Sequence, residues 1–125
     1  MTVVGAAELE FRDFPGRRTA NPFPGAGAAS TVRQVVIEHV DRRSPHRHPQ
    51  SEEVVHVVAG RGRVWLDGTF HAVGPGSWYL IPRGTPHATM ADPGERLDLV
   101  CFFPHADFAN NIEELDLVLD GKETK

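Results

Sequence analysis

The chain has 125 residues, of which 40% are apolar and 24% are charged, and its net charge is -4 when the seven histidines are neutral. This length fits one domain, and the composition is that of a globular protein. The acidic balance provides no basic face for nucleic acid, no apolar run approaches the roughly 20 residues that span a bilayer, and the first residues lack the layout of a signal peptide. We therefore expect a soluble, cytoplasmic protein that binds neither nucleic acid nor a membrane.

The first 30 residues are expected to form a weakly ordered N-terminal arm. Residues 3–4 and 9–11 are suited to short edge strands, and the Phe-Pro-Gly sequence at 14–16 favours a turn. Prolines keep residues 21–27 extended or looping, because they fix φ and remove a backbone donor.

Short segments rich in β-branched and aromatic residues follow, with turn residues between them. They predict strands over residues 32–40, 53–59, 63–66, 69–73, 78–81, 87–90 and 97–103, with a polar break over 41–45 and a hairpin turn at Asp67-Gly68. Such a series is typical of an antiparallel barrel or sandwich, so we expect an all-β fold with the barrel spanning residues 31–104. In the C-terminal segment, residues 105–125, apolar spacing predicts a helix over 110–119.

Two of the predicted strands have distinctive patterns. The valine-rich strand over 53–59 has no polar face, so we expect it to be covered on both sides, by the barrel interior and by another layer or another subunit. The strand over 97–103 places Leu97, Leu99, Cys101 and Phe103 on one face. Cys101 is the only cysteine, which leaves no internal disulfide, and a buried thiol without a basic neighbour is usually inert.

The clearest chemical pattern is His46-Arg47-His48. Two histidines at i and i+2 on an extended segment point to the same side. Glu53 follows five residues after His48, and His87 comes just after a proline- and glycine-rich corner. Imidazole nitrogens and a carboxylate oxygen are ligands that divalent ions of borderline softness accept. Three imidazoles and one carboxylate would occupy four positions of an octahedral ion and leave two open for water or substrate.

These segments resemble the two motifs of the cupin family. Residues 46–60 are similar to H-x-H-x(3,4)-E-x6-G, and residues 76–87 are similar to G-x5-P-x-G-x2-H. The positions that match are His46, His48, Glu53 and Gly60 in the first motif, and Gly76, Pro82, Gly84 and His87 in the second. The resemblance covers about residues 31–103. It implies a small double-stranded β-helix (jelly-roll) barrel, in a homodimer, with one divalent metal ion bound by His46, His48, Glu53 and His87.

The chain departs from the family pattern at turn and support positions. Val40 stands where the first motif begins with glycine, Ser77 replaces a frequent aspartate, and Ala91 replaces the closing asparagine of the second motif. These differences concern local geometry rather than the ligands. Glu52 would replace Glu53 as a ligand if the register slipped by one residue, but the six-residue interval to Gly60 favours Glu53.

The other histidines and the arginines have simpler interpretations. His56 alternates to the face opposite Glu53 and is expected in the core or at a subunit interface, whereas His39 and His71 are expected on the surface. His105 follows the last strand and could line the barrel mouth. Four arginines could bind an anionic substrate, although nothing in the sequence distinguishes one and solvated arginines are more usual: Arg12, Arg17, Arg18 and Arg33.

The resemblance implies a metal-dependent enzyme whose small organic substrate binds the ion, which would be iron, manganese, zinc, nickel or copper. Isomerase, cyclase, lyase and dioxygenase chemistry are all open, because relatives with such ligands support each of them. The candidates for a catalytic role outside the ligand set are Tyr79 and His105. The alternative is a non-catalytic cupin that binds or senses a small ligand.

Overall fold

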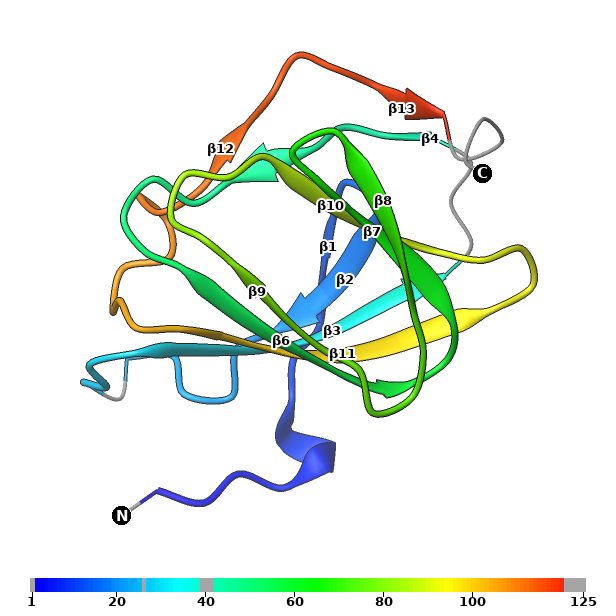
Figure 1. The fold of residues 1–125 in the computed structure, drawn as a ribbon. Helices are drawn as coiled ribbons and strands as arrows, with labels where there is room; N and C mark the ends of the chain where they lie inside the picture. Colours follow the sequence, from blue (N-terminus) through cyan, green and yellow to red (C-terminus); the bar gives the residue numbers. More distant parts are fainter. Residues whose placement is uncertain (1, 26, 39–41, 121–125) are drawn as a thin grey trace.

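Thirteen short strands and one 3-10 turn, η1 (Ala6–Glu8), make up the secondary structure of residues 2–25, 27–38 and 42–120, which are the residues that this computed structural model describes. Two antiparallel sheets curve around a common interior, and a two-stranded ribbon lies at the C-terminal end (Figure 1). These residues contain no α-helix, and therefore no helix that is long and apolar enough to cross a membrane. The expected all-β barrel is confirmed.

The strand order places sequence-distant segments side by side. The six-stranded sheet has the order β1 (Arg12–Phe14), β2 (Arg17–Ala20), β3 (Thr31–Glu38), β11 (Arg96–Phe103), β6 (Glu53–Ala59) and β9 (Trp78–Ile81). The five-stranded sheet has the order β12 (Glu113–Glu114), β5 (His46–Arg47), β10 (His87–Ala91), β7 (Gly62–Leu66) and β8 (Thr69–Val73). The ribbon pairs β13 (Leu119–Asp120) with β4 (Arg42–Arg43).

The barrel interior is filled mainly by the inward face of the six-stranded sheet. β11 lies between β3 and β6, and its alternation buries Leu97, Leu99, Cys101 and Phe103, as expected. On β6 the same alternation turns Glu53, Val55 and Val57 inward. The predicted strands over 53–59, 69–73 and 78–81 have the bounds that the sequence indicates.

Two glycine-containing turns are fixed by backbone geometry. Gly60, at the end of β6, has φ +88°, and a Cβ at this position would lie 2.0 Å from the carbonyl oxygen of Arg96. Glycine is therefore required both for its conformation and for the close approach of two backbones. Between β7 and β8, Asp67 and Gly68 have φ of 43° and 101°, the positive values that a two-residue hairpin turn matching the strand twist needs.

The N-terminal arm differs from its prediction. Residues 3–4 and 9–11 form no strand; instead β1 and β2 form a hairpin around Pro15 and Gly16, within the predicted turn. β2 pairs with β3, so the arm extends the main sheet rather than lying loosely beside it. The break expected over 41–45 is also partly wrong, because Arg42 and Arg43 form β4. His39, predicted to be on the surface, and Val40 lie outside the described residues.

The helix predicted over 110–119 is wrong. The segment runs back across the molecule and pairs its backbone with two other short strands: β12 with β5, and β13 with β4 (Figure 1). Asn111 is fully buried within it. Side-chain hydrogen bonds of asparagine compete with helical backbone bonding, and tertiary contacts here outweigh a weak apolar spacing.

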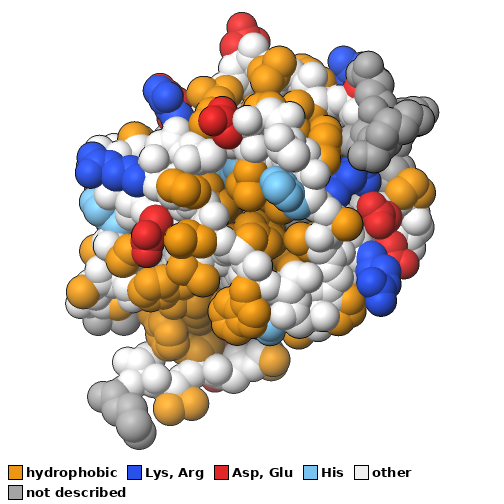
Figure 2. Space-filling view, in the orientation of Figure 1, with side chains coloured by type: hydrophobic (Ala, Val, Ile, Leu, Met, Phe, Trp, Pro, Cys, Tyr) orange, Lys and Arg blue, Asp and Glu red, His pale blue; other side chains and the backbone are white. Residues whose placement is uncertain are grey.

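The outer face of the six-stranded sheet is apolar and exposed in the single chain. The side chains concerned lie on three adjacent strands and are 38–68% exposed: Val58, Trp78, Leu80, Val100 and Phe102. The pairings of Val54 with both Leu80 and Phe102 make these positions contiguous across β9, β6 and β11. Hydrophobic side chains are also exposed in the middle and lower left of the view in Figure 2. Among the described residues, the inner face of β6 is therefore buried and its outer face is only partly covered.

Candidate metal centre

Three buried histidines converge at one end of the barrel interior. His46 begins β5 and His87 begins β10, and the antiparallel pairing of these strands sets the two residues directly opposite each other. His48 follows two residues after His46 and so points to the same side. One nitrogen from each ring lies within 4.8 Å of the other two, and the three residues are at most 6% exposed.

Glu53 reaches the same point from the opposite sheet. It is the first residue of β6 and faces inward, whereas Glu52 is exposed. Its Oε1 atom lies 3.1 Å from Nε2 of His48 and 3.2 Å from Nε2 of His87. The structure thus brings together all four residues of the predicted ligand set and places the alternative carboxylate outside it.

Hydrogen bonds fix the orientation of two of the rings. Nδ1 of His48 lies 2.7 Å from the carbonyl oxygen of Asn111, and Nδ1 of His87 lies 2.9 Å from that of Thr85. Since a carbonyl can only accept, each Nδ1 carries the proton, and in the neutral rings each Nε2 presents a lone pair to the interior. Hydrogen-bonded histidines of this kind are typical of metal ligands.

The lone pairs of this cluster face one another. Nε2 of His48 and Oε1 of Glu53 are both buried acceptors, and neither has a hydrogen-bond partner among the described residues; the same holds for Nδ1 of His46. Acceptors 3.1 Å apart repel unless a proton or a cation lies between them. A set of three imidazole nitrogens and one carboxylate oxygen suits a divalent cation of borderline softness, so the cluster can hold a metal.

The protonation states of His46 and Glu53 favour metal binding. Burial lowers the pKa of His46, as do the neighbouring His87 and Arg43. Burial alone would raise the pKa of Glu53, but the adjacent side chains of His48 and His87 outweigh it and hold that pKa well below its usual range. Neutral imidazoles and an ionised carboxylate are the forms that bind metal.

Asn111 supports the centre and was not found from the sequence. Besides its backbone contact with His48, its Oδ1 accepts a bond from the backbone N–H of Gln50 and its Nδ2 donates to Oγ of Ser51. The C-terminal segment is thereby held against the loop that carries His48. Only the tandem Asn110-Asn111, unusual in a helix, could have suggested this role.

A cavity of about 50 Å³, the inner cavity, adjoins the cluster. His46, Glu53 and His87 line it together with two arginines from different elements, Arg17 at the start of β2 and Arg43 at the end of β4. The other polar groups that line it are Tyr79, Thr89 and Cys101. Arg43 was not considered as a site residue from the sequence, and Arg17 was one of four arginines among which the sequence did not distinguish; the Arg17 side chain is only 6% exposed.

Two of the polar groups of the inner cavity, Tyr79 and Cys101, stay protonated. Burial raises the pKa of the Tyr79 hydroxyl, which lies 2.6 Å from Oγ1 of Thr89. Burial and the Glu53 carboxylate raise the pKa of Cys101, so its thiol is not a ready nucleophile. Tyr79, one of the two catalytic candidates, therefore faces the site as a potential hydrogen-bond donor.

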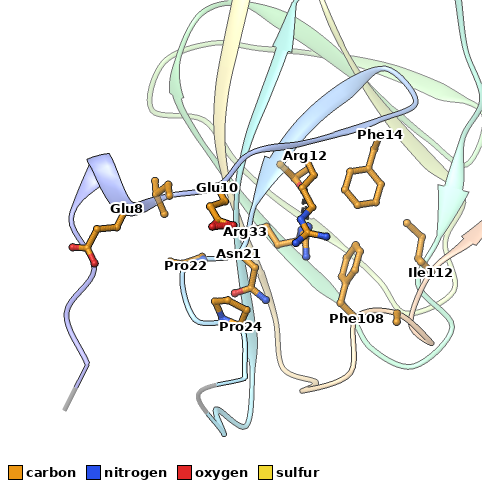
Figure 3. Close-up of a pocket in the computed structure, with 13 residues that line it drawn as sticks. Glu8, Glu10, Arg12, Phe14, Asn21, Pro22, Pro24, Arg33, Phe108 and Ile112 are labelled. Carbon is orange, nitrogen blue, oxygen red and sulfur yellow. Dashed lines mark hydrogen bonds between the residues drawn. The ribbon is translucent and has the colours of Figure 1, made fainter.

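A larger cavity of about 660 Å³, the outer cavity, lies between the N-terminal arm and the C-terminal segment (Figure 3). Phe14 lines the outer cavity and lies near one arginine of each cavity: the guanidinium carbon of Arg17 lies 5.2 Å from its ring centroid, and that of Arg33, which lines the outer cavity, lies 5.6 Å from it. Arg33 also lies 4.3 Å from the ring centroid of Phe108, which in turn packs near His48. Two aromatic residues of the outer cavity thus lie near residues of the site, Phe14 near Arg17 and Phe108 near His48.

The remaining predicted residues lie away from the cluster. His56 faces the outer side of β6 and stacks on Trp78 with ring centroids 4.0 Å apart, and His71 is exposed. Nδ1 of His105 accepts a hydrogen bond from the backbone N–H of Asp107, and His105 is not among the described residues that line either cavity. Of the four arginines considered from the sequence, Arg17 alone lines the inner cavity.

Comparison with known proteins agrees with this architecture. In sequence, 63 residues are 43% identical to protein SchB of Streptomyces halstedii; the match spans 50% of this chain and 46%, about half, of SchB. In structure, the polyketide cyclase RemF of Streptomyces resistomycificus superposes with a TM-score of 0.77 at 23% identity, covering 98% of this chain and 91% of RemF. The nucleoside dehydratase Pac13 gives a TM-score of 0.77 at 15% identity, covering 98% and 97%. At these identities the two structures establish the fold alone.

The family itself follows from the sequence of the barrel. The model of the cupin domain matches residues 34–103, more than half of the chain, and this range contains the three histidines, Glu53 and the strands that carry them. The protein belongs to the cupin family.

Proposed function

We propose that this protein is a metal-dependent enzyme that acts on a small organic molecule inside the barrel, with His46, His48, Glu53 and His87 as the ligands of one divalent ion. The observation that carries the proposal is the cluster of buried, mutually facing acceptors with no hydrogen-bond partner among the described residues. When bound, such an ion supplies Lewis-acid chemistry: it polarises a carbonyl group or stabilises the negative charge of an enolate.

The surrounding residues favour carbonyl chemistry. Carbonyl oxygens of Asn111 and Thr85 hold the His48 and His87 rings with Nε2 turned toward the interior. Arg17 and Arg43 bring positive charge to the same small space, where negative charge on a substrate oxygen would be stabilised. Tyr79, kept protonated by burial, can donate a hydrogen bond to such an oxygen.

The comparisons support a reaction of this class. RemF is a polyketide cyclase and Pac13 a nucleoside dehydratase, and variants of Pac13 have been seen with uridine. Ring closure and loss of water are both reactions that a Lewis acid promotes without net oxidation. We therefore favour cyclase, lyase or isomerase chemistry over dioxygenation for this chain.

Elemental analysis of untagged protein, purified without chelators or metal columns, tests the first step. We expect about one divalent ion per chain, removable by a chelator and restored by zinc or manganese. Protein that takes up no ion from an excess of iron, manganese, zinc, nickel or copper would refute the proposal. One iron per chain with substrate-dependent oxygen uptake would instead indicate dioxygenation.

Catalysis is tested separately from metal binding. The metal-loaded protein is incubated with a panel of polycarbonyl compounds and nucleosides, and their consumption is followed by mass spectrometry, with a metal-free sample as control. We expect turnover that depends on the metal. A compound that is retained stoichiometrically and recovered unchanged would identify the non-catalytic, ligand-binding cupin.

We also infer that the protein forms a homodimer through the outer face of the six-stranded sheet. Support comes from the contiguous exposed side chains of β6, β9 and β11, of which Trp78 is 68% exposed and Leu80 is 54% exposed. A face of this kind on a soluble chain marks an association surface.

Analytical ultracentrifugation tests this inference. The unaltered chain should be a dimer and Leu80→Arg should be a monomer. The control is Val118→Arg, a change at a 52% exposed valine outside this face, and it should remain a dimer. A monomeric unaltered chain would refute the inference.

A further inference from the structure

We infer that the substrate is an organic anion, whose negatively charged oxygen group is held in the inner cavity between Arg17 and Arg43 and beside the metal. This inference rests on the proposed function and narrows its substrate class. The two residues come from the N-terminal hairpin and from β4, outside the histidine-bearing segments, and the topology brings both to one cavity.

The two guanidinium groups are buried and only partly paired. Nη1 of Arg43 donates to the carbonyl of Thr89, whereas its Nε is buried without a partner among the described residues. Nη1 of Arg17 donates to the carbonyl of Pro15 at 2.8 Å, and its Nη2 lies 3.9 Å from the half-exposed carboxylate of Glu114. A guanidinium has five N–H donors, so both groups have donors left for a ligand.

The charges of the inner cavity do not balance without a ligand. Burial lowers the pKa of Arg43 to about 10, and the neighbouring Arg17 contributes to this shift, yet the group stays charged at neutral pH. Glu53 is the carboxylate that lines the same space, and in the proposed site its charge is directed to the metal. Two buried guanidinium groups near a divalent ion leave an excess of positive charge, which an anionic ligand offsets.

The size of the inner cavity restricts what it can hold. Its volume of about 50 Å³ admits on the order of four water-sized groups. A single carboxylate or enolate fits this space, whereas a ring system does not. The planar oxygen pair of a carboxylate matches the fork of an arginine side chain.

The experiment compares two probes of the same shape but different charge, acetate and acetamide, on zinc-loaded protein. Binding is followed by NMR line broadening of the probe methyl group, and zinc content is measured on each sample. Arg17→Met and Arg43→Met are the test variants; the controls are their strand neighbours Arg18→Met and Arg42→Met, whose side chains are 40% and 67% exposed. Arg43→Lys is added in case Arg43→Met does not fold.

We expect acetate to bind and acetamide not to bind, with acetate affinity reduced about tenfold or more in each test variant and unchanged in the controls. Equal acetate binding by test and control variants would overturn the inference. Zinc-loaded protein that binds no acetate would also overturn it, and would leave the proposed function intact. Acetate binding that depends on both arginines in protein that takes up no metal would instead refute the proposed function alone.

Discussion

The two ends of the barrel interior are built from the same strands but have opposite chemistry. At one end β6 and β10 begin with Glu53 and His87, and the inner cavity lies between them. At the other end the same strands and β11 contribute Val57, Ala91 and Leu97, none of which has exposed surface. Alternation decides only that a side chain faces inward, so position along the strand decides whether it serves the site or the core.

This division separates stability from function. The apolar end excludes water and gains its stability from close packing, since apolar burial is the main favourable term in folding. The polar end contains buried donors and acceptors that oppose folding unless a ligand satisfies them. We therefore expect substitutions at the polar end to affect binding and substitutions at the apolar end to affect unfolding.

The largest expected effect is on metal content. His48→Ala removes one of the nitrogens that face Glu53, so we expect metal to fall from about one ion per chain to a trace while circular dichroism still shows a folded barrel. His56→Ala serves as the matched control, because His56 lies on the outer side of β6, and it should retain the metal. A His48→Ala protein with a full complement of metal would show that the ligand assignment is wrong.

The opposite result is expected at the apolar end. Leu97 has no exposed surface, so Leu97→Ala should reduce the free energy of unfolding by about 2–5 kcal/mol through lost burial and an unfilled cavity. The folded fraction should still bind metal with unchanged affinity. Urea denaturation measures the loss, with Leu117→Ala as control, since Leu117 is 47% exposed. A weakened metal site in folded Leu97→Ala would remove the distinction between the two ends.

Sequence reasoning succeeded where local pattern decides structure. The alternation of residues 97–103 and the valine-rich run of 53–59 specify strands on their own, and the motif resemblance points to three histidines and a glutamate that the structure places close together, whose role as metal ligands stays a prediction. Sequence reasoning failed where the pairing of segments far apart in the chain determines the structure. Nothing local shows that Arg17 and Arg43 meet in one cavity, or that residues 110–119 pair with β5 and β4 instead of forming a helix.

The smallest effect concerns a residue that supports the site without lining it. Asn111→Ala keeps the backbone carbonyl that accepts from His48 but removes the side-chain bonds to Gln50 and Ser51 that hold it in place. We expect metal affinity to fall about tenfold, the low end for loss of a residue that orients a ligand, with metal stoichiometry retained. Competition with a chromogenic chelator measures the change, and the exposed neighbour variant Asn110→Ala should match the unaltered chain. If both variants bind metal equally well, the C-terminal segment packs against the polar end without positioning His48.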